Sequence, residues 1–106
     1  MEQFIYVLKA VRPAMLTDGP TASEAATIER HNAHLDRMAK SGAVLLAGRT
    51  QNTDRSAFGI IILQAESESR AREMMRSDPF IADGVAEGVL YPYKISYLSK
   101  ALTVSP

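Results

Sequence analysis

The sequence has no cysteine among its 106 residues, which excludes disulfides, thiolate zinc sites and cysteine nucleophiles. An excess of either charge is also missing, because 12 basic residues balance 12 acidic ones. No run of like charges occurs along the chain. A nucleic-acid-binding protein would be expected to carry a basic patch or stripe, so we expect no nucleic-acid partner.

Long hydrophobic runs are absent too. No stretch approaches the roughly 20 apolar residues of a membrane-spanning helix, and the first ten residues carry an acid where a signal peptide has positive charge. We therefore expect a cytoplasmic protein with no membrane partner. The chain also lacks the GxSxG, GxGxxG and P-loop motifs, so nothing in it indicates a nucleophile elbow or a nucleotide site.

What is present is an ordinary globular composition, with 46% apolar and 23% charged residues. A chain of this length is expected to form one domain, over residues 1–106, and to bury a substantial core. Alternating and continuous apolar patterns predict strands at residues 4–11, 43–47, 57–65 and 89–99. Helical patterns predict one helix over residues 21–41 and a second from Ser67 to Asp78.

Local signals set the ends of these elements. Thr21 and Glu24 fit a capping box that starts the first helix. Gly42 suits the left-handed position that ends it. The short polar loop over residues 50–56 predicts an antiparallel hairpin between the second and third strands, and Pro92 indicates that the last strand either lies at the edge of the sheet or contains a bulge.

The resulting order is strand, helix, strand, strand, helix, strand. This predicts an α+β, ferredoxin-like βαββαβ fold, with a four-stranded antiparallel sheet and two helices on one face. The strands over residues 4–11 and 57–65 are apolar at nearly every position, which indicates burial on both faces. Two helices cover only one face, so we expect a homodimer that packs through the open sheet face.

His31 is the first candidate functional residue. At 100° per residue, Leu35 lies about 40° and Ile28 about 60° from His31, so His31 belongs to the apolar stripe of its helix. His34, about 60° to the other side, lies at the margin of the stripe. An inward imidazole is either a core histidine with a satisfied hydrogen bond or a functional group, and the helical geometry alone leaves both open.

Asp78 is the second candidate. Pro79 disfavours helical angles for the residue before it, so Asp78 should leave the helix and its carboxylate can point into an adjoining cleft. The alternative is an ordinary aspartate in a turn before proline.

Taken together, these features resemble the YCII-related family. The resemblance rests on Val11-Arg12-Pro13, on His31 eleven residues before Gly42, on the strand Val44-Leu45-Leu46-Ala47-Gly48-Arg49, on Asp78-Pro79-Phe80 with Gly84, and on Pro92-Tyr93. It implies a dimeric α/β-barrel fold and a His–Asp active site, for which His31 and Asp78 are the matching positions. It further implies lyase or dehydrohalogenase-like elimination on small aromatic or quinone-like compounds.

The chemistry of such a pair is consistent with this implication. A carboxylate bonded to one imidazole nitrogen fixes the tautomer and makes the other nitrogen more basic, so that nitrogen can move a proton. We therefore predict His31 and Asp78 as the catalytic pair. Arg12 and Arg49, at strand ends, are predicted substrate-binding residues that could hold an anionic oxygen, or else solvated arginines.

Tyr6 and Phe80 are predicted to line the substrate cleft, with core packing as the alternative for both. Two other functions remain open. One is a non-catalytic ligand-binding or accessory module with a vestigial pair. The other is a metal site built on His31 and His34, for which the sequence shows no third ligand. We predict no metal and no cofactor.

Overall fold

A computed structural model describes residues 1–102 of the protein. Along the chain these residues form β1 (Glu2–Ala10), α1 (Ala14–Thr17), α2 (Ala22–Lys40), β2 (Val44–Arg49), β3 (Gly59–Ala65), α3 (Glu68–Ser77), α4 (Pro79–Ala82) and β4 (Ala86–Tyr93). The expectation of one domain over residues 1–106 stays a prediction, and its last four residues lie outside the described part.

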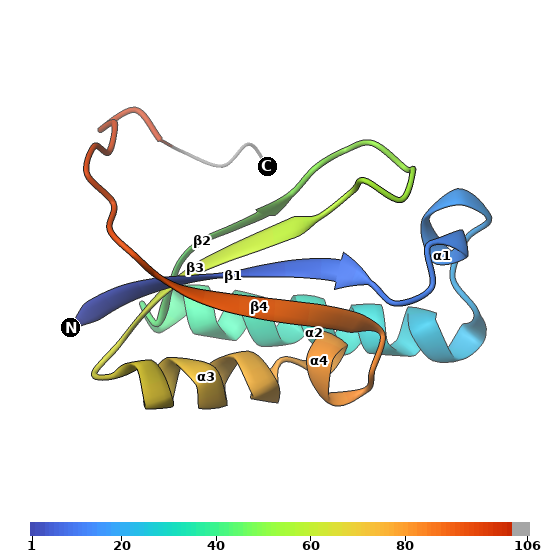
Figure 1. The fold of residues 1–106 in the computed structure, drawn as a ribbon, viewed down its shortest axis with the longest axis horizontal. Coiled ribbons are helices and arrows are strands. Elements are labelled where there is room, and N and C mark those ends of the chain that lie inside the picture. Colours follow the sequence, from blue (N-terminus) through green and yellow to red (C-terminus); the bar gives the residue numbers. More distant parts are fainter. Residues whose placement is uncertain (103–106) are drawn as a thin grey trace.

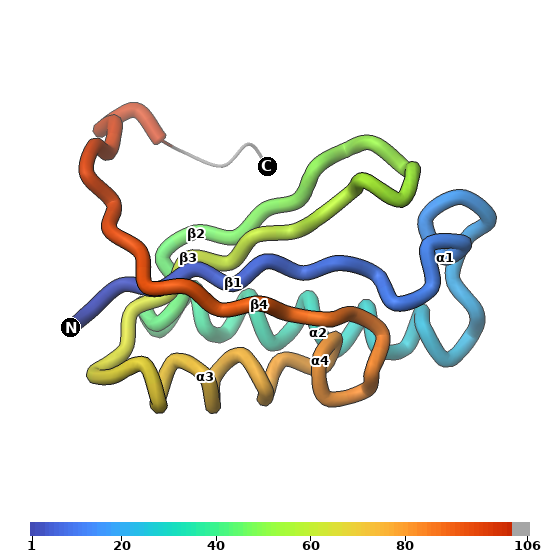
Figure 2. Tube along the Cα trace, in the orientation of Figure 1, coloured from blue at the N-terminus to red at the C-terminus, as the bar shows by residue number. Residues whose placement is uncertain are grey.

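The four strands form one sheet in the order β2-β3-β1-β4, and all neighbouring strands are antiparallel. Helices α2, α3 and α4 lie together on one side of this sheet (Figure 1). Figure 2 shows β1 between its two partner strands, β3 and β4. Strand β4 is an edge strand of the sheet. The predicted ferredoxin-like α+β fold is therefore confirmed.

Helix α2 begins and ends where the sequence predicts. The Thr21 side chain accepts a hydrogen bond from the Glu24 amide at 3.1 Å, and the Glu24 carboxylate accepts one from the Thr21 amide at 2.8 Å. This is a complete capping box, which satisfies two of the free amides of the first turn. Gly42 follows the helix with a φ of +84°, a value that glycine adopts without steric cost.

The last strand differs from the expectation of residues 89–99. It starts earlier, at Ala86, and ends at Tyr93, because its ladder runs alongside β1 from Ala10 back to Gln3. Beyond that point the Ile95 amide bonds to the side chain of Gln3 rather than to a backbone carbonyl. Two short helices supplement the predicted elements. Helix α1 was not predicted, whereas α4 lies at the start of the connection over residues 80–88, for which the sequence leaves a short turn of helix open.

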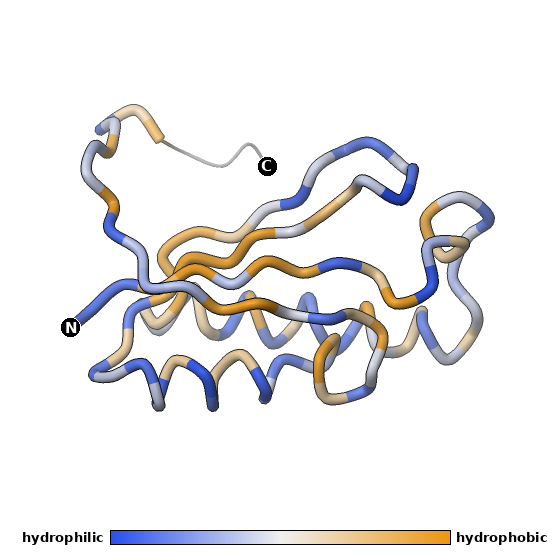
Figure 3. The backbone as a smooth tube through the Cα atoms, in the orientation of Figure 1, coloured by the Kyte–Doolittle hydropathy of each residue, from blue (hydrophilic) through white to orange (hydrophobic). Residues whose placement is uncertain are grey.

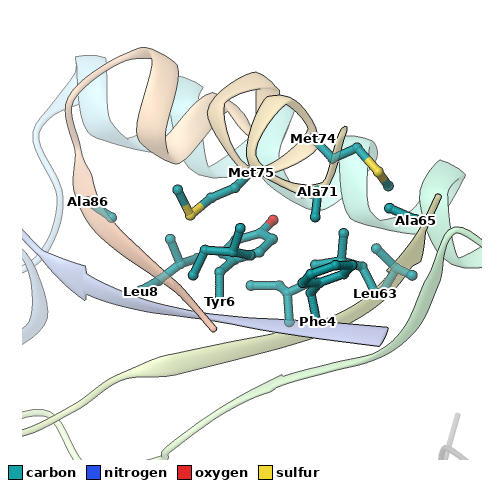
Figure 4. Packing of buried hydrophobic residues seen from close by; sticks show 12 residues of the cluster. Phe4, Tyr6, Leu8, Leu63, Ala65, Ala71, Met74, Met75 and Ala86 are labelled. Carbon is teal, nitrogen blue, oxygen red and sulfur yellow. The ribbon is translucent and has the colours of Figure 1, made fainter. Parts of the chain in front are cut away.

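The core lies between the helices and one face of the sheet. Phe4, Tyr6 and Leu8 point from β1 into this layer, each at most 5% exposed, and Figure 4 shows them beneath α3. Gly88 allows close contact here, since a Cβ at this position would lie 2.8 Å from Ile81 and 3.1 Å from Met75. A side chain at residue 88 would therefore require the Ile81 and Met75 side chains to shift.

The other face of the sheet is also apolar. By register it carries Ile5, Val7, Leu46, Ile60, Ile62, Val89, Tyr91 and Tyr93. Figure 3 shows that the strands are mainly hydrophobic, whereas the loop between β2 and β3 is hydrophilic. Val89 and Tyr91 are each about half exposed, at 51% and 50%. We call this surface the open sheet face, because α2, α3 and α4 lie on the opposite side.

Within residues 1–102, the longest helix is too polar to serve as a membrane span. The cytoplasmic location expected from the sequence stays a prediction.

Candidate functional site

His31 is held on the inward face of α2. It is only 8% exposed, and Leu35, one turn further along the helix, packs against the hydrophobic core. The helical angles computed from the sequence place it there, since residues three and four apart share one side of a helix. An imidazole in this position needs a polar partner.

Asp78 supplies that partner from the junction of α3 and α4. Its backbone is extended, with φ −62° and ψ 125°, as expected for a residue that precedes proline. It ends α3 and begins α4, where its Oδ1 accepts the Phe80 amide at 3.0 Å. Its side chain is completely buried.

The two side chains meet directly. His31 Nδ1 lies 2.7 Å from Asp78 Oδ1, and the Tyr6 hydroxyl donates to Asp78 Oδ2, also at 2.7 Å. The Phe80 ring stacks on the imidazole with centroids 3.7 Å apart and planes 5° from parallel. The phenol oxygen of Tyr6 points from β1 toward the helix layer (Figure 4). Strand β1, helix α2 and the α3–α4 junction therefore each contribute to one cluster, the His31–Asp78 site.

The electrostatics of the site keep Asp78 charged. Burial alone would raise the pKa of its carboxyl, but the hydrogen bonds from His31 and Tyr6 together outweigh burial, so the pKa lies below the ordinary 3.8. Burial, followed by the charge of Asp78, raises the pKa of Tyr6 well above its usual value. Tyr6 therefore remains a protonated donor to an ionised carboxylate at neutral pH.

The contact with Asp78 determines the tautomer of the His31 imidazole. Against an ionised carboxylate, His31 Nδ1 carries the proton and donates it to the hydrogen bond, which leaves Nε2 with a free lone pair in the neutral ring. Among residues 1–102, no buried side-chain nitrogen lacks a hydrogen-bond partner, and no protein partner of Nε2 is found there. We infer that Nε2 reaches solvent, where it can take up or release a proton.

The structure brings together four of the six predicted site residues: His31, Asp78, Tyr6 and Phe80. Arg12 instead bonds to Glu24 at the start of α2, with its Nε 3.0 Å from the carboxylate, and this holds the pKa of Glu24 at about 2. Arg49 borders a hollow of the open sheet face together with Phe58. The substrate-binding roles of the two arginines stay predictions, and neither guanidinium is among the groups bonded to the pair.

His34 lies at the margin of the site, as its angle suggests, and among residues 1–102 it makes no hydrogen bond to the pair. It is partly buried, and burial lowers its pKa. In the part of the chain that the structure describes, no group of three or more His, Cys, Asp or Glu side chains could hold a metal ion.

Sequence reasoning missed the hydrogen bond from Tyr6 to Asp78. Tyr6 was considered only as a cleft wall or a core residue, because β1 is apolar on both faces and its alternation does not show which face meets the helices. The polar end of a buried tyrosine usually finds a hydrogen-bond partner, and that rule was the available signal.

The fold and the site define a ferredoxin-like α+β protein with a buried His–Asp pair. The chain belongs to the YCII-related family, since the model of the YCII-related domain matches residues 4–93. This confirms the resemblance drawn from the sequence motifs.

Among solved structures, the chain is similar to 5-chloro-2-hydroxyhydroquinone dehydrochlorinase from Burkholderia phenoliruptrix, in complex with 2,5-dihydroxybenzoquinone. The identity is 20% and the TM-score 0.56, and the match covers 86% of this chain and 93% of the dehydrochlorinase chain. At this identity the likeness supports the fold. A search of curated proteins found no significant match.

The lowered pKa of Asp78 predicts how stability depends on pH. A depressed carboxyl pKa contributes stability that is present above the unfolded value, near 3.8, and is lost as the pH falls through the lower folded value. We expect the urea midpoint of the wild type to fall more between about pH 6 and about pH 3 than that of Asp78→Asn. Equal losses in the two proteins would contradict the assigned pKa direction.

Proposed function

We propose that this protein is a small-molecule enzyme that uses the His31–Asp78 pair for acid–base chemistry of the lyase or dehydrohalogenase type. The observation that carries the proposal is the 2.7 Å contact between His31 Nδ1 and a fully buried carboxylate. The carboxylate also accepts from the Tyr6 hydroxyl and the Phe80 amide. Three donors hold Asp78 in place, so it can orient the imidazole and fix its tautomer.

In this proposal His31 Nε2 is the group that exchanges a proton with the substrate. In a dehydrohalogenation, Nε2 takes a proton from the substrate, and the electron pair left behind forms the new π bond of the product. The halide leaves with the electron pair of its bond to carbon. Asp78 compensates the positive charge that forms on the imidazole, and Tyr6 holds Asp78 through its second oxygen.

The substrate class is proposed from two features. Phe80 already stacks on the imidazole, so a planar aromatic compound would find an aromatic border beside the proton-transfer group. The similar solved structure is a dehydrochlorinase bound to a dihydroxybenzoquinone. We propose small hydroxylated aromatic or quinone-like compounds, with Phe80 as a contact. Arg12 and Arg49 do not bond to the His31–Asp78 pair. They would bind the substrate only if it extended from the pair to these side chains, or if a second protomer brought its own arginines to the site.

The proposal includes a homodimer through the open sheet face. The aliphatic and aromatic side chains of that face form a contiguous surface over all four strands. Contiguous apolar surfaces of this kind mark interaction sites, and a second copy offers the same surface by two-fold symmetry.

One observation favours a second candidate function. The His31 side chain is only 10% exposed and one face of its ring is covered by Phe80, which narrows the access of a substrate. A non-catalytic module that binds small ligands on the same fold would carry the same buried pair as a structural element.

The test uses 5-chloro-2-hydroxyhydroquinone, the compound in the name of the similar dehydrochlorinase, with chloride release as the readout. We expect the wild type to release chloride faster than buffer and His31→Gln to be at least about 100-fold slower. His34→Gln is the matched control and should keep its activity. Binding of 2,5-dihydroxybenzoquinone without chloride release would favour the binding module. Equal rates for wild type and His31→Gln would contradict the proposed role of the pair.

A further inference from the structure

A second carboxylate lies at the other end of α4. Asp83 follows the last residue of this short helix, and its Oδ2 accepts the Thr27 hydroxyl at 2.8 Å. The Arg30 guanidinium bonds to the same oxygen and also donates to the Thr27 hydroxyl oxygen at 3.1 Å. Thr27 is 2% exposed, and its buried hydroxyl bonds to both Asp83 and Arg30. We call Thr27, Arg30 and Asp83 the α4 clamp.

The α4 clamp and the His31–Asp78 site are built in the same way: in each, a residue of α2 bonds to an aspartate at one end of α4. Thr27 and His31 are four residues apart on α2, which places them one turn, or about 6 Å, apart on the same face. Asp78 and Asp83 flank the single turn of α4. The order is antiparallel, because Asp78 bonds to the later residue of α2 and Asp83 to the earlier one. Both ends of α4 are therefore attached to one face of α2.

A single helical turn has little stability of its own, since helix formation starts from an unfavourable nucleus. Contacts with neighbouring elements must therefore fix the position of α4. That position determines two features of the site. One is the contact of Asp78 with the imidazole, and the other is the stack of Phe80 on His31. A backbone bond from the Val85 amide to the Phe80 carbonyl at 3.0 Å and the packing of Ile81 against the hydrophobic core also restrain this segment. The bonds to Thr27 and His31 are the ones that attach it to α2.

We propose that Thr27, Arg30 and Asp83 are positioning residues that fix α4 along α2 and thereby hold the Asp78 carboxylate and the Phe80 ring on His31. The inference rests on the proposed function for its catalytic meaning, while the geometry that it explains is a property of the folded protein. In support, the hydrogen bonds from Thr27 first and Arg30 second hold the pKa of Asp83 below its ordinary value, as expected for a carboxylate that accepts both bonds.

The test is the ¹⁵N and ¹H NMR spectrum of the His31 ring, which reports the tautomer and the Nδ1 hydrogen bond without any substrate. Thr27→Val removes the hydroxyl but keeps the shape, and Thr27→Ser keeps the hydroxyl. We expect Thr27→Val and Asp83→Asn to lose the Nδ1–H signal and to move the ring nitrogens toward a mixture of tautomers. Thr27→Ser should keep the wild-type spectrum.

The matched control is Asp36→Asn, which removes an exposed ion pair to Lys40 on the same helix, away from α4. It should leave the His31 signals unchanged. Folded Thr27→Val and Asp83→Asn with wild-type His31 signals would overturn the inference, even if both were less stable. Failure of Thr27→Val to fold, together with altered His31 signals in folded Asp83→Asn, would still support it. If the spectra change as expected but the wild type releases no chloride, the clamp stands and the proposed function fails.

Discussion

Asp78→Ala is expected to be strongly destabilising, lowering the free energy of unfolding by about 3 kcal/mol. The carboxylate is completely buried and accepts three hydrogen bonds. Alanine would leave the Tyr6 hydroxyl and His31 Nδ1 inside the protein without an acceptor, and it would remove the cap of α4. The same change should abolish any activity, because nothing would then orient the imidazole.

Urea unfolding measures the stability loss, and Asp36→Ala is the control because its carboxylate is exposed and pairs with Lys40. Tyr6→Phe is a graded comparison. It removes one donor and leaves two, so its loss should be smaller than that of Asp78→Ala. A midpoint for Asp78→Ala close to that of Asp36→Ala would mean that the buried hydrogen bonds contribute little to folding.

Val89→Glu is expected to have the largest effect on association. Val89 is 51% exposed on the open sheet face, so a single folded chain should tolerate a charge there. In the proposed dimer the same carboxylate would be buried without a partner, a cost of several kcal/mol, equivalent to at least about 100-fold in the dissociation constant.

Sedimentation at micromolar concentration measures this effect. The wild type should run at twice the mass of the chain, and Val89→Glu at the mass of one chain. Ala33→Glu, on the exposed side of α2, is the control and should remain dimeric. A wild type that sediments as a monomer would contradict the proposed dimer, and a dimeric Val89→Glu would place the interface elsewhere.

The fold was predictable because its local signals agree with one another. The capping box at Thr21, the left-handed Gly42 and the proline that ends α3 all lie where the sequence indicates. The end of β4 was not predictable, because residues 94–99 keep a strand-like composition. The strand ends where its ladder with β1 stops, at Gln3, and that residue lies more than 80 residues away in the sequence.

The candidate site was predictable in part. Helical geometry places His31 inward, and Pro79 takes Asp78 out of its helix, so both halves of the pair had local signals. Their contact is confirmed at 2.7 Å. The Tyr6 bond and the α4 clamp had no comparable signal, since Thr27 and Asp83 are 56 residues apart and each appears ordinary in its own segment.

The separations along the chain have a consequence for the folding kinetics. His31 and Asp78 are 47 residues apart, and Tyr6 and Asp78 are 72 apart. Contacts of this range form only after large loops have closed, so their entropic cost comes before their stabilising effect. The residues of the site come from β1, from α2 and from the α3–α4 junction in the second half of the chain. A folding intermediate in which only one half is ordered therefore has no such site, and the Nδ1 hydrogen bond of His31 forms only as the two halves dock.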